Sequence, residues 1–148
     1  MAETVLTTTP WEDGSGLGPA LQIVEANLHV LLRQWLVEYA FEAKTTFIKN
    51  PQHKWRASSG MQKAIRQGNV ETALRMAQGL FSLDPEYLWR RLPVIAMEDV
   101  GVADVAPVTA VLWVAGKKVW REQNGGSQKV LYCLVERLAR SVAIWSAG

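Results

Sequence analysis

Apolar residues recur every three to four positions in successive segments of this chain, and glycine or proline separates the segments. The clearest segment follows Asn69 and places six apolar side chains on one helical face: Val70, Ala73, Leu74, Ala77, Leu80 and Phe81. This spacing is typical of an amphipathic helix. No segment shows the alternation of apolar and polar residues that a half-buried strand requires. The pattern predicts an all-α fold, a compact bundle of about five to six helices joined by short loops.

The first helix is predicted to begin at Pro19, because proline suits a first helical position, and its apolar spacing continues to Tyr39. A second apolar stripe occupies another face of the same helix and consists of Ile23, Val30, Val37 and Phe41. A helix with two apolar faces is covered on both sides. We therefore expect it to be either central to the bundle or part of a subunit interface.

Capping residues predict where the next helices begin. Ser58 or Ser59 suits the start of a short second helix that Gly68 ends, and Asn69 suits the start of the third. Each is followed by apolar residues at helical spacing. These segments should therefore form two helices joined by a tight turn.

The fourth helix is predicted to start at Asp84, an N-cap residue that precedes a proline, and to end at Gly101. Pro93 lies inside this segment. A proline there removes one backbone donor and crowds the preceding turn. We therefore expect the helix to kink or to be interrupted near Leu92.

Two further helices are predicted in the C-terminal half. The core stripe of the fifth consists of Val108, Val111, Leu112, Ala115 and Val119. The sixth starts at Ser127, after two glycines, and its stripe consists of Leu131, Leu134, Leu138, Val142 and Trp145.

The chain has 148 residues, 49% of them apolar, which favours a single helical domain over residues 19–148. Residues 1–18 combine a threonine run, an acidic pair and several glycines, and predict a flexible arm. The single cysteine, Cys133, lies in an apolar stretch, which favours a reducing compartment. Neither a membrane-spanning run nor a signal peptide is evident, so the sequence predicts a cytoplasmic protein without membrane contact.

Residues 53 to 105, about a third of the chain, resemble the C-terminal domain of the replication-associated recombination AAA+ ATPases, the RarA/MgsA and Werner-helicase-interacting family. The matching positions are Ser59, Lys63, Arg66, Gly68, Asn69, Ala73-Leu74, Arg90-Arg91-Leu92 and the run from Ile95 to Asp104. Pro93 and the tryptophan-rich C-terminal half depart from the family pattern. The resemblance implies an all-helical fold like the clamp-loader collar, a role in holding subunits together, and a setting in DNA replication, recombination or repair. Detached domains of this kind are plausible in a phage or mobile element.

The ATPase chemistry does not follow from that resemblance. A phosphate-binding loop needs Gly-x-x-x-x-Gly-Lys-Ser/Thr, because backbone amides wrap the phosphates and the lysine neutralises them. Neither Gly14-Ser-Gly-Leu-Gly nor Gly116-Lys117-Lys118 fits that pattern. His29 and His53 are isolated from other ligand types, so no metal or other cofactor is expected. The sequence thus predicts a module that is not an enzyme.

An acidic cluster lies at the end of the fourth helix. Neighbouring carboxylates can act as an acid and a base, and Glu98 and Asp99 give an enzyme as a lesser alternative. Such groups more often belong to ion-pair networks. We expect a structural network formed by Arg90, Arg91, Glu98, Asp99 and Asp104, with Lys63 and Arg66 as further cationic partners.

The formal net charge is only +2, but residues 44–91 hold nine lysines or arginines and three acidic residues. Residues 44–56 also interleave cations with aromatics, a combination that single-stranded nucleic acid uses for phosphate contact and base stacking. The candidate DNA-binding residues are Lys44, Lys49, Lys54, Trp55, Arg56, Lys63 and Arg66. The alternative is that Phe47 and Trp55 fill the core and the charges are merely solvated.

The chain has seven tryptophans, a residue enriched at protein interfaces. Trp113, Trp120 and Trp145 are candidate interface residues. The leading hypothesis is therefore a homo-oligomer, dimer or tetramer, that docks on a replication or recombination protein. Direct binding of single-stranded DNA is the alternative.

Overall fold

The computed structural model describes residues 17–40 and 53–147, and these ranges are helical without any strand. Seven α-helices occupy them: α3 (Leu17–Glu38), α4 (Lys54–Arg66), α5 (Val70–Leu83), α6 (Pro85–Ile95), α7 (Val105–Val114), α8 (Lys118–Gln123) and α9 (Ser127–Ala147). A π-helical turn, η2 (Ala96–Val100), and a 3-10 turn, η3 (Gly101–Ala103), join α6 to α7. The all-α bundle predicted from the sequence is confirmed.

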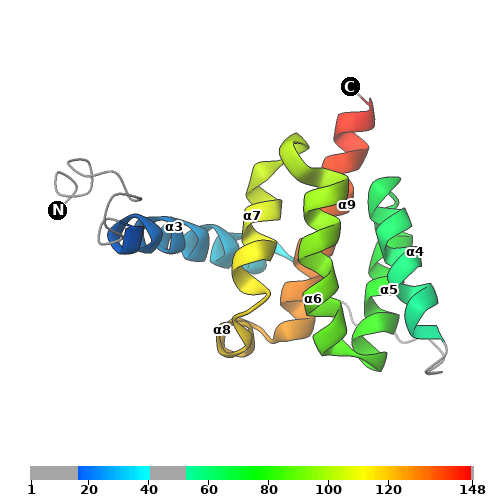
Figure 1. Cartoon of the computed structure of the whole chain (residues 1–148), viewed down its shortest axis with the longest axis horizontal. Coiled ribbons are helices and arrows are strands. Elements are labelled where there is room, and N and C mark those ends of the chain that lie inside the picture. Colours follow the sequence, from blue (N-terminus) through cyan, green and yellow to red (C-terminus); the bar gives the residue numbers. More distant parts are fainter. Residues whose placement is uncertain (1–16, 41–52, 148) are drawn as a thin grey trace.

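The centre of the bundle is α9, which contacts α3, α4, α5, α7 and α8 (Figure 1). Its residues 130–135 are all buried, so this part of the helix is covered around its whole circumference. A helix that is apolar on all sides belongs in the middle of a bundle. The other helices are therefore arranged around it.

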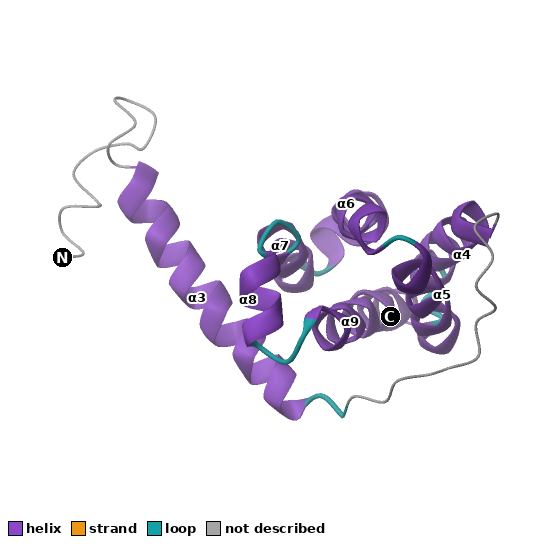
Figure 2. Ribbon diagram, turned by 90° about the horizontal axis from the view of Figure 1, so that it is seen from below, coloured by secondary structure: helices purple, strands orange, loops and turns teal. Residues whose placement is uncertain are grey.

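Helix α3 differs from the rest in direction and in coverage. It runs across α7 and α9, and its N-terminal half extends away from the bundle (Figures 1 and 2). Its C-terminal half buries Leu28, Leu32, Trp35 and Leu36. Of the two predicted alternatives, a central helix is wrong, because only one of the two apolar faces of α3 packs on the bundle, and the subunit interface stays a prediction.

Two predicted helix starts are confirmed. The Asn69 side chain accepts a hydrogen bond from the Thr72 amide (3.2 Å), and the Asp84 side chain accepts one from the Tyr87 amide (3.0 Å). Each cap satisfies an amide that has no partner inside its own helix.

The second predicted start is wrong, because α4 begins at Lys54 and contains both Ser58 and Ser59. Ser58 is buried, and its hydroxyl lies 3.4 Å from the Tyr87 hydroxyl. This serine therefore connects α4 to α6 instead of capping a helix.

Pro93 does not interrupt its helix near Leu92, so the predicted interruption is wrong, and the predicted kink stays a prediction. Helix α6 continues to Ile95, and the amide of Ala96 donates to the Leu92 carbonyl across the proline. Proline lacks one donor, but its own carbonyl and those of its neighbours still accept. The α-helical geometry changes only beyond the proline, at η2.

The fifth predicted helix is divided into α7 and α8, which explains why seven helices are present in the described ranges. Leu112 and Val119 were expected in the core and are exposed, whereas Ala110 and Val114 are buried. The division follows Val114, where the Arg121 side chain binds two carbonyls at the end of α7. Within residues 17–40 and 53–147, no helix has the length and apolar character needed to span a membrane.

Candidate functional site

The acidic residues after α6 face α4, because η2 packs against that helix. The Asp99 side chain is 6% exposed and accepts from Arg66 Nε at 2.8 Å. Gln62 donates to Asp99 (3.1 Å) and to Glu98 (3.3 Å), and its own carbonyl accepts from Arg91 (2.9 Å). The Gln62 amide therefore connects Arg91 to both carboxylates. The hydrogen bond from Arg66 to Asp99 raises the pKa of Arg66.

The structure brings only part of the predicted ion-pair network together. Arg66 contacts Asp99 directly, and Arg91 reaches the carboxylates through Gln62. Asp104 lies elsewhere and accepts from Ser141 of α9 at 2.6 Å, and Arg90 is exposed beside a different pocket. The sequence reasoning missed Gln62, because an uncharged amide gives no electrostatic pattern along the chain.

Three candidate DNA-binding residues lie at the start of α4, while Lys44 and Lys49 fall outside the described residues. Lys54 is paired with Asp84 at 2.7 Å, and this contact lowers the pKa of the Asp84 carboxyl. Trp55 is 62% exposed and meets Tyr87 edge-on, with ring centroids 5.3 Å apart. The alternative in which Trp55 fills the core is therefore wrong.

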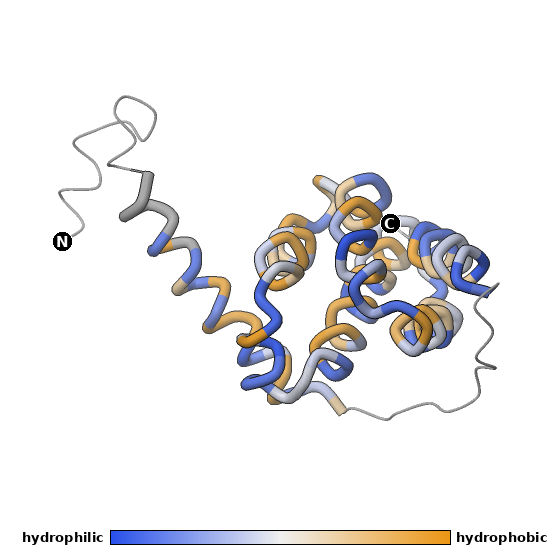
Figure 3. Tube along the Cα trace, turned by 60° about the horizontal axis from the view of Figure 1, so that its bottom comes forward, coloured by the Kyte–Doolittle hydropathy of each residue, from blue (hydrophilic) through white to orange (hydrophobic). Residues whose placement is uncertain are grey.

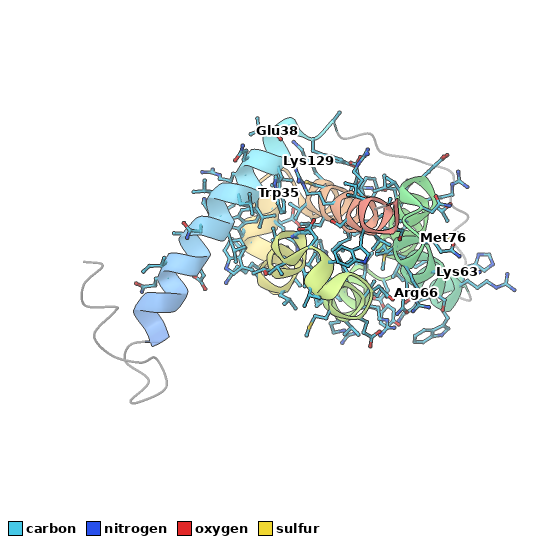
Figure 4. The ribbon with its side chains drawn as sticks, turned by 90° about the horizontal axis from the view of Figure 1, so that it is seen from above. Trp35, Glu38, Lys63, Arg66, Met76 and Lys129 are labelled. Atoms are coloured by element: carbon cyan, nitrogen blue, oxygen red, sulfur yellow. The ribbon has the colours of Figure 1, made fainter. Side chains whose placement is uncertain are left out.

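The rest of α4 exposes cations without any acidic residue in the helix. Arg56 and Lys63 are exposed, and Arg66 is exposed although it contacts Asp99. Lys63 and Arg66 lie on the outer side of the bundle, away from Trp35 and Glu38 of α3 (Figure 4). This surface is one candidate for a contact with an anionic partner.

Two of the three predicted interface tryptophans are packed inside the chain. Trp113 and Trp120 meet edge-on with centroids 5.2 Å apart, and Trp120 Nε1 donates to Nδ1 of His29 at 2.6 Å. They join α7 and α8 to α3. Trp145 is 69% exposed near the end of α9, so it is the member of the three that presents its ring to solvent.

A pocket of about 460 Å³ lies between α3, α7 and α9, and three of its charged groups, Glu136, Arg137 and Arg140, have partners. Arg140 pairs with Glu136 at 2.6 Å, and the Arg137 guanidinium lies 4.0 Å from the Trp35 ring centroid. Burial raises the pKa of the Cys133 thiol in this pocket to about 11. The thiol is therefore protonated near neutral pH, which makes it a poor nucleophile.

The outer face of α3 carries a row of exposed apolar side chains. Ile23, Val30 and Val37 are 49%, 65% and 85% exposed, and they lie opposite the buried Leu28, Leu32 and Trp35. Figure 3 shows hydrophobic residues recurring along the part of α3 that leaves the bundle. Single exposed apolar residues are common, but an aligned row makes this face a candidate interaction surface.

Among the described residues, no three histidine, cysteine, aspartate or glutamate side chains form a group that could hold a metal ion. Comparison with protein-family models, with curated proteins and with solved structures finds no match to this chain.

Proposed function

We propose that this chain is a non-catalytic interaction module that assembles with a second copy of itself through α3. The observation that carries the proposal is the exposed apolar stripe of Ile23, Val30 and Val37. We further propose a setting in DNA replication, recombination or repair, which the resemblance of residues 53 to 105 supports. In that setting the assembled module would dock on a replication or recombination protein.

The stripe has the geometry of a helix-pairing surface. Its residues are seven positions apart, so they form a row nearly parallel to the helix axis and about 21 Å long at 1.5 Å per residue. Their exposure leaves apolar area in contact with water. Burying that area between two copies contributes about 25 cal/mol per Å² to the free energy of association. The bundle packs on the opposite face of α3, so two such helices can meet with their bundles on the outer sides.

An antiparallel pair matches this stripe with its own copy. A two-fold axis beside Val30 places Ile23 of one copy opposite Val37 of the other, which makes the contact self-complementary. A parallel pair would instead place Arg33, which is one turn from Val30, next to Arg33 of the other copy, and like charges at that distance repel. Charge therefore favours the antiparallel arrangement.

The Val30→Cys variant tests pairing through the α3 stripe, because residue 30 lies beside the two-fold axis and would meet its own copy. Under mild oxidation we expect most of the variant to form a disulfide-linked dimer, visible by non-reducing electrophoresis. The native Cys133 is buried and should not contribute. Val102→Cys is the control, since Val102 is 94% exposed but lies away from α3.

Light scattering over a concentration series provides the second measurement. The unmodified chain should be a dimer at micromolar concentration, and Val30→Asp should be a folded monomer because a carboxylate cannot be buried there unpaired. A monomeric unmodified chain at high micromolar concentration, or equal cross-linking of the two cysteine variants, would contradict self-association through α3.

Direct binding of single-stranded DNA is a second candidate function, favoured by the exposed ring of Trp55 beside Arg56 and Lys63. Stacking of a base on an aromatic ring contributes about 1–3 kcal/mol, and phosphate contacts make binding fall with salt. We expect Trp55→Ala to weaken the binding of a labelled oligonucleotide about tenfold or more. Lys63→Gln should reduce the salt dependence.

Arg75→Gln is the matched control, because Arg75 is exposed on α5 and already paired with Glu71. Titrations of single- and double-stranded DNA at two salt concentrations make the measurement. Salt-insensitive binding, no binding, or equal loss in the Arg75 control would exclude α4 as a DNA surface.

A further inference from the structure

A second pocket, of about 530 Å³, lies where α6 meets α8 and the start of α9. Its size is within the range of small-molecule sites, about 300–1,000 Å³. Phe81 and Pro85 give it an apolar side, and Trp89 and Arg121 also line it. This combination of an apolar wall and a cation is the kind of surface that holds an organic anion.

Arg121 is the unusual residue in this pocket, because its side chain is charged and the residue is only 5% exposed. Its Nε donates to the Ser127 hydroxyl (3.1 Å), and its Nη1 donates to the carbonyls of Val114 (2.8 Å) and Ala115 (2.7 Å). The guanidinium carbon lies over the ring of Trp89, 4.2 Å from its centroid.

Within the described residues, two features of Arg121 leave it open to a ligand, although none of its nitrogens is both buried and without a partner. Its second terminal nitrogen, Nη2, donates no hydrogen bond there, and no carboxylate lies within ion-pair distance. Burial lowers the pKa of this guanidinium, although it stays charged at neutral pH. A largely buried cation with a donor still accessible from the pocket is stabilised by an anion.

The rim of the pocket carries further charge. Arg90 of α6 and Lys118 of α8 are exposed cations, and Glu86 and Glu122 are exposed acids. Glu122 is already engaged, since its carboxylate accepts from the Ser127 hydroxyl at 3.0 Å. Three cations and two acids therefore leave the pocket with a net positive charge.

We propose that this pocket binds a small organic anion, a carboxylate or phosphate monoester, whose charged group pairs with Arg121 and Lys118 while its apolar part packs against Phe81. The site lies away from the α3 stripe and does not depend on self-association. Failure of one proposal therefore leaves the other standing.

Titration of the full chain with phenyl phosphate and with benzoate, followed by ¹H–¹⁵N NMR, tests the site. The indole N–H of Trp89 and the Nε–H of Arg121 are the local reporters. We expect saturable shifts of both signals with at least one of the two probes, and the probe that saturates identifies the preferred head group. Inorganic phosphate and benzyl alcohol should bind at least tenfold more weakly. Inorganic phosphate lacks the apolar part of the ligand, and benzyl alcohol lacks the charged group.

Lys118→Gln should weaken binding about tenfold, and Glu86→Gln should strengthen it, because the first removes a cation and the second an acid. Arg75→Gln is the control for surface charge and should bind like the unmodified chain. Linear shifts without saturation, equal binding of inorganic phosphate, or no effect of Lys118→Gln would overturn the proposal. Lys118 is exposed, so the Lys118→Gln variant is expected to fold. A change in its binding therefore does not come from loss of the structural contacts that Arg121 makes.

Discussion

Replacing Gly68 with alanine is expected to destabilise the fold by about 2–5 kcal/mol. Gly68 has a φ of +69°, where an L-residue is strained by about 1–2 kcal/mol. A Cβ atom there would lie 2.8 Å from the backbone N and Cα of Ala143 in α9. Backbone cannot move aside as a side chain can, and overpacking of this kind contributes about 1–3 kcal/mol more.

Gly60→Ala is the matched control. Gly60 lies in α4, and its added Cβ would meet Met76 Sδ at 3.0 Å, an atom in a flexible side chain. The methionine can shift, and alanine favours a helix over glycine by about 1 kcal/mol. We therefore expect a change within about 1 kcal/mol. Urea unfolding monitored by circular dichroism measures both variants, and an unchanged midpoint for Gly68→Ala would contradict the close approach of the α4–α5 turn to α9.

Replacing Arg121 with methionine is expected to destabilise the fold by about 3 kcal/mol. The substitution keeps much of the packing on Trp89 but removes donors from the Ser127 hydroxyl and from the carbonyls of Val114 and Ala115. A buried polar group left without a partner destabilises by about 1–3 kcal/mol. Loss of the carbonyl contacts should loosen the end of α7, and amide hydrogen exchange should quicken there first.

The Arg121→Lys variant tests whether the positive charge alone, without the geometry of the guanidinium, stabilises the fold. Lysine keeps the positive charge but cannot reproduce the planar fork that reaches two carbonyls and a hydroxyl together. We expect it to recover less than half of the lost stability. Arg75→Met is the surface control and should change stability by less than about 0.5 kcal/mol, as exposed pairs usually do. Equal effects of Arg121→Met and Arg75→Met would show that the buried contacts of Arg121 contribute little.

The helical segments could be predicted because their signals are local. The stripe from Val70 to Phe81 and the caps at Asn69 and Asp84 lie within a few residues of the helices they specify. Prediction was less successful where a distant residue competes with the local pattern. The helical spacing from Val108 to Val119 looks continuous, but the Arg121 side chain binds the carbonyls at the end of α7, where the two helices separate.

The candidate sites could be predicted only in part, for a similar reason. Charge along the sequence indicated that Arg66 would face an acidic residue, and it pairs with Asp99 at 2.8 Å. It gave no indication that Gln62 connects Arg91 to two carboxylates. Glutamine and a buried arginine have many possible partners, and the choice depends on which helices pack together.

The sequence by itself determined the all-α fold class and several helix starts, because apolar periodicity and caps act over one or two turns of the chain. Only the tertiary structure decided which faces are covered. Two apolar rows on α3 are equally visible in the sequence, but the bundle buries Leu32 and leaves Val30 in water. Burial is set by contacts between helices far apart in sequence, and a local pattern shows that a face is apolar without showing what covers it.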